Sequence, residues 1–126
     1  METYYELSET EYEIMEYFWS ITQPVQFKDI LTYFNTVKEK DWKKQTLGTY
    51  LKFLQDKKFL QVDDTAFRKK YAAAYSKEQY LHNQAVAICQ TSFDNSIGKF
   101  IAAFSGGEKL DDQSVRELKE YLKQYE

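Results

Sequence analysis

The sequence predicts a mainly α chain with a small two-stranded antiparallel β wing, and three observations support this prediction. Three amphipathic helical segments follow one another within residues 9–58. Two short runs come directly after them, and in the first of these runs apolar and polar residues alternate. Residues 76–126 return to helical spacing. Helix, helix, helix and two-stranded ribbon is the order of a winged helix, so we expect a winged helix-turn-helix over residues 1–75 and a separate helical region over residues 76–126.

The first helix is predicted from about Glu9 to Ile21. Ser8 and Glu11 form a capping box, in which each side chain satisfies a backbone N–H at the helix start. Pro24 follows the helix and disfavours helical backbone in the residue before it. A second, short helix is predicted from about Phe27 to Asn35, although no strong capping residue marks its start.

The third helix lies in KDWKKQTLGTYLKFLQDKK, residues 40–58. At helical spacing its leucines form one stripe, which we expect to face the core. Gln45, Thr49 and Lys52 fall on the opposite side, and Gly48 falls on the flank. The third helix therefore presents a polar face to its surroundings.

The predicted wing consists of LQVDD and FRKKYAAAY, joined by the turn DTA, which begins at the last residue of the first run. The alternation in the first run and the turn residues between the runs indicate a β-hairpin. Arg68, Lys69 and Lys70 lie near its tip and on its returning strand.

Residues 76–126 carry more apolar surface than so few residues can bury among themselves. Ser76 and Gln79 form a second capping box, and Asp111 can cap a last helix. These helices either pack back on residues 1–75 or pack against a second chain, and we expect a homodimer. The predicted dimerisation residues are Leu81, Ala85, Ile88, Ile97, Phe100, Ile101, Phe104, Val115, Leu118 and Leu122.

The net charge of −3 conceals strong segregation of charge. Residues 1–37 contain one Lys and seven acidic residues, whereas residues 38–70 contain ten Lys or Arg and five acidic residues. Such a basic block attracts phosphate, because each neutralised phosphate releases condensed counterions. The alternative is a lysine-rich surface that is simply solvated.

The sequence offers little for catalysis. His82 has no acidic or cysteine neighbour at helical spacing, Cys89 sits on an apolar helical face, and SGG at 105–107 lacks the rest of a phosphate-binding loop. We expect no enzymatic activity, no cofactor and no metal site, because one Cys and one His cannot build a zinc site. With no apolar run long enough for a membrane span and no basic signal-peptide start, we expect a cytoplasmic protein without membrane insertion.

The polar helix and the basic wing together favour binding to double-stranded DNA. The second helix of a helix-turn-helix enters the major groove, where Gln can pair with adenine, a Thr methyl can contact thymine and Lys can hold phosphates. The alternative is a protein-interaction module whose basic ribbon meets an acidic protein surface. The predicted DNA-binding residues are Lys43, Lys44, Gln45, Thr46, Gly48, Thr49, Lys52, Arg68, Lys69 and Lys70.

Gly48 costs the third helix about 1 kcal/mol compared with alanine. Either good packing of the leucine stripe tolerates this cost, or the missing side chain lets the helix backbone approach DNA more closely.

Four stretches, LSETEYEIMEYFW, QTLGTYLKFLQDKKFL, RKKYAAAYSKEQYL and IGKFIAAFSGGEKLDDQSVRELKEYL, resemble in order and spacing the penicillinase and methicillin-resistance repressor family. The specific points include Thr46, Leu47 and Thr49 and the run from Phe104 to Leu110. The resemblance spans residues 7–123. It implies a dimeric winged-helix repressor of a resistance or stress gene, which binds inverted-repeat operators and dimerises through its C-terminal helices.

The resemblance also bears on induction. The copper-responsive branch carries a C-terminal cysteine cluster that this chain lacks. In the β-lactam branch, a membrane sensor-protease triggers cleavage at an Asn-Phe bond, and the matching bond here joins Ala103 to Phe104. Gly48 and Phe53 stand where family members commonly carry arginine. The first operator half-site to test is of the TACA/TGTA type.

Overall fold

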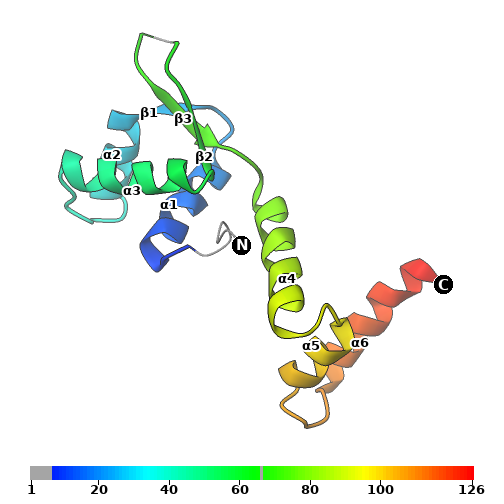
Figure 1. Ribbon diagram of the computed structural model, residues 1–126. Coiled ribbons are helices and arrows are strands. Elements are labelled where there is room, and N and C mark those ends of the chain that lie inside the picture. The colour runs from blue at the N-terminus through cyan, green and yellow to red at the C-terminus, as the bar shows by residue number, and fades with distance from the viewer. Residues whose placement is uncertain (1–6, 66) are drawn as a thin grey trace. The chain divides into compact units, whose positions relative to one another are not determined.

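The computed structural model describes residues 7–65 and 67–126. The described chain divides into two compact units, with the division between Gln84 and Ala85. Helices dominate both units, and the single sheet in the described chain lies in the first (Figure 1). The prediction of a mainly α winged-helix chain is confirmed.

The first unit has the predicted order of three helices and a hairpin (Figure 1). Its elements are α1 (Glu9–Ser20), β1 (Val25–Gln26), α2 (Phe27–Thr36), α3 (Lys44–Asp56), β2 (Leu60–Asp63), β3 (Lys70–Ala73) and the first part of α4 (Lys77–Ser92).

The capping box at the start of α1 is confirmed. The Ser8 backbone N–H donates to Glu11 Oε1 at 2.9 Å, and the Glu11 N–H donates to Ser8 Oγ at 3.1 Å. Helix α2 begins where Asp29 accepts a hydrogen bond from the Gln26 backbone N–H at 3.1 Å. Both helices thus begin where a side chain satisfies a backbone donor that the helix itself leaves unpaired.

The sheet has three antiparallel strands in the order β1-β3-β2, one more than predicted. The predicted hairpin pairs Leu60 with Ala73 and Asp63 with Lys70. The additional strand β1 pairs Val25 with Tyr71. Two residues are too few to show the alternation by which a strand is recognised, so β1 could not be predicted from its own residues.

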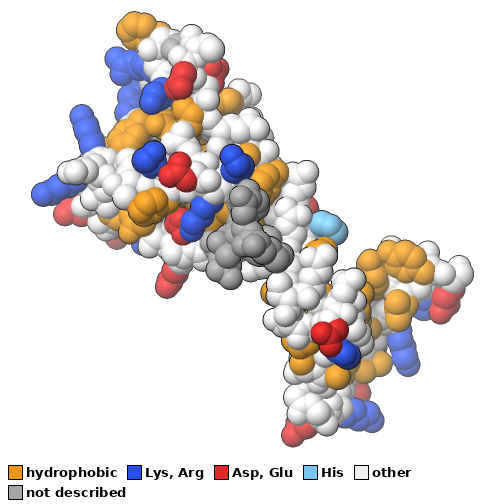
Figure 2. Space-filling model, in the orientation of Figure 1, with side chains coloured by type: hydrophobic (Ala, Val, Ile, Leu, Met, Phe, Trp, Pro, Cys, Tyr) orange, Lys and Arg blue, Asp and Glu red, His pale blue; other side chains and the backbone are white. Residues whose placement is uncertain are grey.

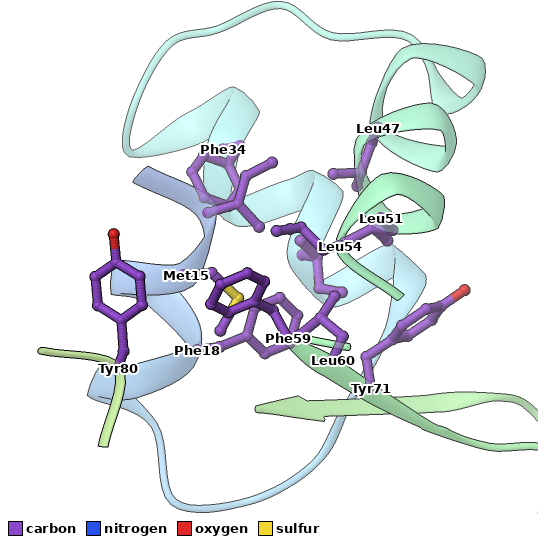
Figure 3. Packing of buried hydrophobic residues seen from close by; sticks show 12 residues of the cluster. Met15, Phe18, Phe34, Leu47, Leu51, Leu54, Phe59, Leu60, Tyr71 and Tyr80 are labelled. Atoms are coloured by element: carbon purple, nitrogen blue, oxygen red, sulfur yellow. The ribbon is translucent and has the colours of Figure 1, made fainter. Parts of the chain in front are cut away.

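The core of the first unit lies between α1, α2, α3 and the sheet (Figure 3). The leucine stripe of α3 faces inward as predicted, because its three leucines are at most 1% exposed. The core cluster consists of Ile14, Met15, Phe18, Ile30, Phe34, Leu47, Leu51, Leu54, Phe59, Leu60, Tyr71 and Tyr80. Burial of this stripe leaves the opposite side of α3, with its polar residues and Phe53, available to a ligand.

The turn between α2 and α3 is held by one side chain. Asn35 Nδ2 donates to the Trp42 carbonyl at 2.9 Å, and the Trp42 N–H donates to Asn35 Oδ1 at 2.7 Å. The Trp42 ring stacks on Phe34 with centroids 5.1 Å apart. These contacts fix the direction in which α3 leaves the turn.

The first turns of α4 belong to the first unit. Trp19 Nε1 donates to the Tyr75 carbonyl at 3.1 Å, and Lys77 Nζ lies 3.0 Å from Glu16 Oε1. Tyr80 is 3% exposed and joins the core. The compact unit therefore runs past Tyr75, while the assignment of DNA binding and dimerisation to residues 1–75 and 76–126 remains a prediction.

The second unit contains the rest of α4, then α5 (Ile97–Phe104), α6 (Asp112–Leu122) and a short 3₁₀ helix, η1 (Lys123–Tyr125). Asp111 caps α6 as predicted and accepts from the Ser114 N–H at 2.7 Å. Helices α5 and α6 are described in full, and neither has a fully buried residue. Their apolar faces remain partly open to solvent.

Candidate nucleic-acid interface

The outer face of α3 carries the predicted base-reading side chains. Gln45, Thr46 and Thr49 are exposed, and the side chain of Lys52 is 75% exposed. The Thr49 hydroxyl donates to the Gln45 carbonyl at 3.0 Å, which uses its proton within the helix and leaves its methyl group for outside contacts. The structure thus brings these four side chains to one accessible face, and their contact with DNA stays a prediction.

Gly48 lies on the flank of α3 and is half-buried. A Cβ atom added there would lie 4.0 Å from Phe27 Cε2 of α2, an ordinary van der Waals distance. The position faces a neighbouring helix as well as the flank of the polar surface.

The wing presents a run of exposed residues. Phe67 is 97% exposed, and the Arg68 guanidinium lies 5.9 Å from the centre of its ring. Lys69 and Lys70 are exposed too, and Lys70 opens β3. Figure 2 shows Lys and Arg side chains over the first unit. The three cations of the predicted basic wing, Arg68, Lys69 and Lys70, are therefore accessible.

The turn before this run has its own local support. Thr65 donates to Asp63 Oδ1 from both its N–H, at 2.9 Å, and its hydroxyl, at 2.6 Å. Hydrogen bonds from the Thr65 side chain and backbone lower the pKa of Asp63 below its ordinary value.

One pocket of about 360 Å³ joins α2, α3 and the wing, and we call it the α2–wing pocket. It brings together three predicted residues, Lys44, Arg68 and Lys69, and adds Lys28, which sequence reasoning missed. Lys43, Lys52 and Lys70 are not among the residues that line it. The described residues that line it are Gln26, Phe27, Lys28, Leu31, Thr32, Lys44, Arg68, Lys69 and Tyr71.

Two features of the sequence could have identified Lys28 as a candidate site residue. It is the single Lys among residues 1–37, and it lies in the first turn of α2. The helix dipole disfavours a cation at that end by about 0.3–1 kcal/mol. Lys44 repeats this arrangement at the start of α3. Lysines thus occupy this unfavourable position at the starts of both helices that line the pocket.

His82 and Cys89, for which the sequence predicts no catalytic role, both lie on α4. His82 is exposed on α4, and Cys89 is half-buried further along the same helix. Within residues 7–65 and 67–126, no group of three His, Cys, Asp or Glu side chains could hold a metal ion. Nor does any described helix have the length and apolarity that a membrane crossing requires.

The predicted dimerisation residues lie on α4, α5 and α6, and most are exposed. Ile97 is 74% and Phe104 69% exposed, while Phe100, Ile101 and Val115 are half-buried. A pocket of about 250 Å³ opens between α5 and α6, and Phe100, Ile101, Phe104, Leu110, Ser114, Glu117 and Leu118 line it. Figure 2 shows hydrophobic side chains on the surface of this unit.

The bond that the resemblance singles out, Ala103–Phe104, lies in the last turn of α5. Both residues are exposed. Cleavage at this bond remains a prediction.

Residues 7–124 match the family model described as "Penicillinase repressor". A search of the curated proteins finds no match.

Proposed function

The chain belongs to the penicillinase repressor family, a family of transcriptional repressors, and we propose that it represses transcription by binding an inverted-repeat operator as a homodimer. The observation that carries this proposal is the division of α3 into two faces. Its leucine stripe is completely buried, whereas Gln45, Thr46, Thr49 and Lys52 are exposed beside the basic wing. A helix held in this way can enter the major groove while its neighbours contact phosphates.

Homodimer formation is supported by the apolar surface of the second unit. Side chains as large as Ile97 and Phe104 are mostly exposed there, and contiguous apolar patches on soluble proteins commonly mark interaction sites. Two copies related by a twofold axis would present two α3 helices to two half-sites of opposite orientation. An inverted repeat is therefore the operator that such a dimer fits.

Relief of repression through cleavage at Ala103–Phe104 by a membrane sensor-protease is part of the proposal, and the regulated gene would be a resistance or stress gene. A cut there would divide the α5–α6 pocket, leaving Phe100 and Ile101 on one fragment and Leu110 and Leu118 on the other. Because the bond is helical, the last turn of α5 has to unwind before a protease can bind it in an extended form.

The test is a binding titration with duplexes that carry a TACA/TGTA-type inverted repeat, with shuffled duplexes of the same composition as the reference. We expect the best operator to bind roughly a thousandfold more tightly than the shuffled duplex. Affinity should fall linearly with salt on a double-logarithmic plot. Equal affinity for upstream regions of candidate genes and for shuffled duplex would contradict operator binding.

A further inference from the structure

The α2–wing pocket collects cations from three segments that are far apart in the sequence. Lys28 comes from α2, Lys44 from α3, and Arg68 and Lys69 from the wing. Among the described residues that line it, none carries a carboxylate. Four like charges around one pocket repel one another, and an anion placed among them would relieve that repulsion.

Carboxylates near the pocket do little to neutralise it. Asp29 follows Lys28, but its carboxylate accepts from the Gln26 backbone N–H and does not line the pocket. Lys69 Nζ lies 3.9 Å from Asp64 Oδ1, and both side chains are at least 65% exposed, so this ion pair is weak. Among the described residues, Lys28, Lys44 and Arg68 make no ion pair within 4.0 Å.

The walls of the pocket suit a phosphate that is attached to a sugar. Phe27, Leu31 and Tyr71 provide apolar surface in the same lining as the four cations. The positive ends of two helix dipoles, at the starts of α2 and α3, add to the field of the lysines.

The charges beside the pocket favour a linear polyanion over a single small anion. Two of the cations that line the pocket have an exposed lysine as their neighbour in the chain, Lys43 beside Lys44 and Lys70 beside Lys69. A DNA strand, which carries a phosphate at every nucleotide, can meet such a row of charges.

We propose that the α2–wing pocket holds one backbone phosphate of each operator half-site and that Lys28 is one of its ligands. This inference rests on the proposed function and deepens it. Lys44 immediately precedes Gln45, so a phosphate fixed in the pocket would set the position of the base-reading face of α3 along the groove.

The first test compares Lys28→Gln with Lys38→Gln in the full chain. Lys38 is an exposed lysine just beyond the other end of α2, so both variants remove one charge from the same unit. We expect Lys28→Gln to weaken binding to operator and shuffled duplex about tenfold each, and to reduce the salt slope by about one per protomer. Lys38→Gln should change affinity less than twofold, and Lys28→Arg should bind like the wild type. Equal effects of the two glutamine variants would overturn the inference.

The second test locates the phosphate. Operators with a single uncharged methylphosphonate per half-site are bound to the wild type and to Lys28→Gln. We expect one position at which the replacement weakens binding of the wild type and causes no further loss in the variant. Losses that add at every position would overturn the inference, while operator preference of the wild type would still support the proposed function.

A third test distinguishes a DNA backbone phosphate from a free anion in the α2–wing pocket. Inorganic phosphate is titrated into the wild type by NMR, with chloride lowered to keep the ionic strength constant. We expect no saturable shift at the pocket. Saturable binding that Lys28→Gln abolishes, together with unchanged DNA affinity, would assign the pocket to a free anion and overturn the inference.

Discussion

Glu11 is a carboxylate that the fold takes into the core, at 4% exposure, and holds with several donors. Lys57 Nζ lies 2.8 and 3.0 Å from its two oxygens, and Ser8 donates to it from the backbone. Burial raises the pKa of Glu11, but the hydrogen bonds from Lys57 and Ser8 outweigh burial and leave it below the ordinary 4.5. This contact ties the start of α1 to the residue that follows α3.

The lowered pKa predicts how stability depends on pH. A carboxylate with a depressed pKa in the folded state stabilises the protein above pH 4.5, and that contribution is lost as the pH falls through the lowered pKa. We expect Glu11→Gln to lower the free energy of unfolding by about 1–3 kcal/mol at pH 7, and this difference should shrink in acid. Urea titrations between pH 7 and pH 3 measure it.

The exposed Glu9 in the same turn of α1 provides the control. Glu9→Gln should cost no more than about 1 kcal/mol. A deficit of Glu11→Gln that stays constant down to pH 3 would contradict the ionised contact.

The substitution Gly48→Ala has one expected effect on stability and a separate possible effect on DNA binding. The Cβ atom of alanine would meet Phe27 at an ordinary distance, so Gly48→Ala should raise the free energy of unfolding by about 0.5–1 kcal/mol through helix propensity alone. Thermal melts measure this gain, and operator titrations of the same variant test close approach to DNA. Unchanged operator affinity and specificity would show that the missing side chain plays no part in binding.

At the scale of elements, the direction of α3 depends on the turn that precedes it. Asn35 closes this turn through its two hydrogen bonds to the Trp42 backbone. We expect Asn35→Ala to lower the free energy of unfolding by about 1–3 kcal/mol and to weaken operator binding beyond the loss of stability, because α3 is no longer held in one orientation.

The adjacent Thr36 is the matched control for Asn35. It is exposed, and its hydroxyl donates only within its own helix, to the Thr32 carbonyl at 2.7 Å. Thr36→Ala should leave both denaturant midpoint and operator affinity close to wild type. If the two variants behave alike, the turn does not depend on the hydrogen bonds between the Asn35 side chain and the Trp42 backbone.

The elements that local signals mark were predictable from the sequence. Capping boxes at Ser8 and Ser76 and the alternation in LQVDD gave the helix starts and the hairpin. Strand β1 was missed, because it exists only through pairing with β3, far along the chain. The α2–wing pocket was missed for the same reason: Lys28 and Arg68 are distant in sequence, and only the folded chain shows that they meet.

At the scale of the whole molecule, the exposed apolar side chains of the second unit predict association. Phe104 is 69% exposed, so Phe104→Gln should cost an isolated chain little stability but raise the dimer dissociation constant at least about tenfold. Val37→Gln replaces an apolar side chain of the first unit that is 63% exposed and should leave association unchanged. Sedimentation equilibrium over a range of concentrations measures both. A wild type that stays monomeric throughout would refute the dimer.

Both tryptophans of the chain lie in the first unit, Trp19 against Tyr80 and Trp42 against Phe34. Residues 85–126 contain none. Tryptophan emission therefore reports melting of the first unit alone, whereas far-ultraviolet circular dichroism reports the helices of both. Recorded on one sample at several concentrations, the two signals distinguish loss of the winged helix from loss of the C-terminal helices, and neither needs an attached dye.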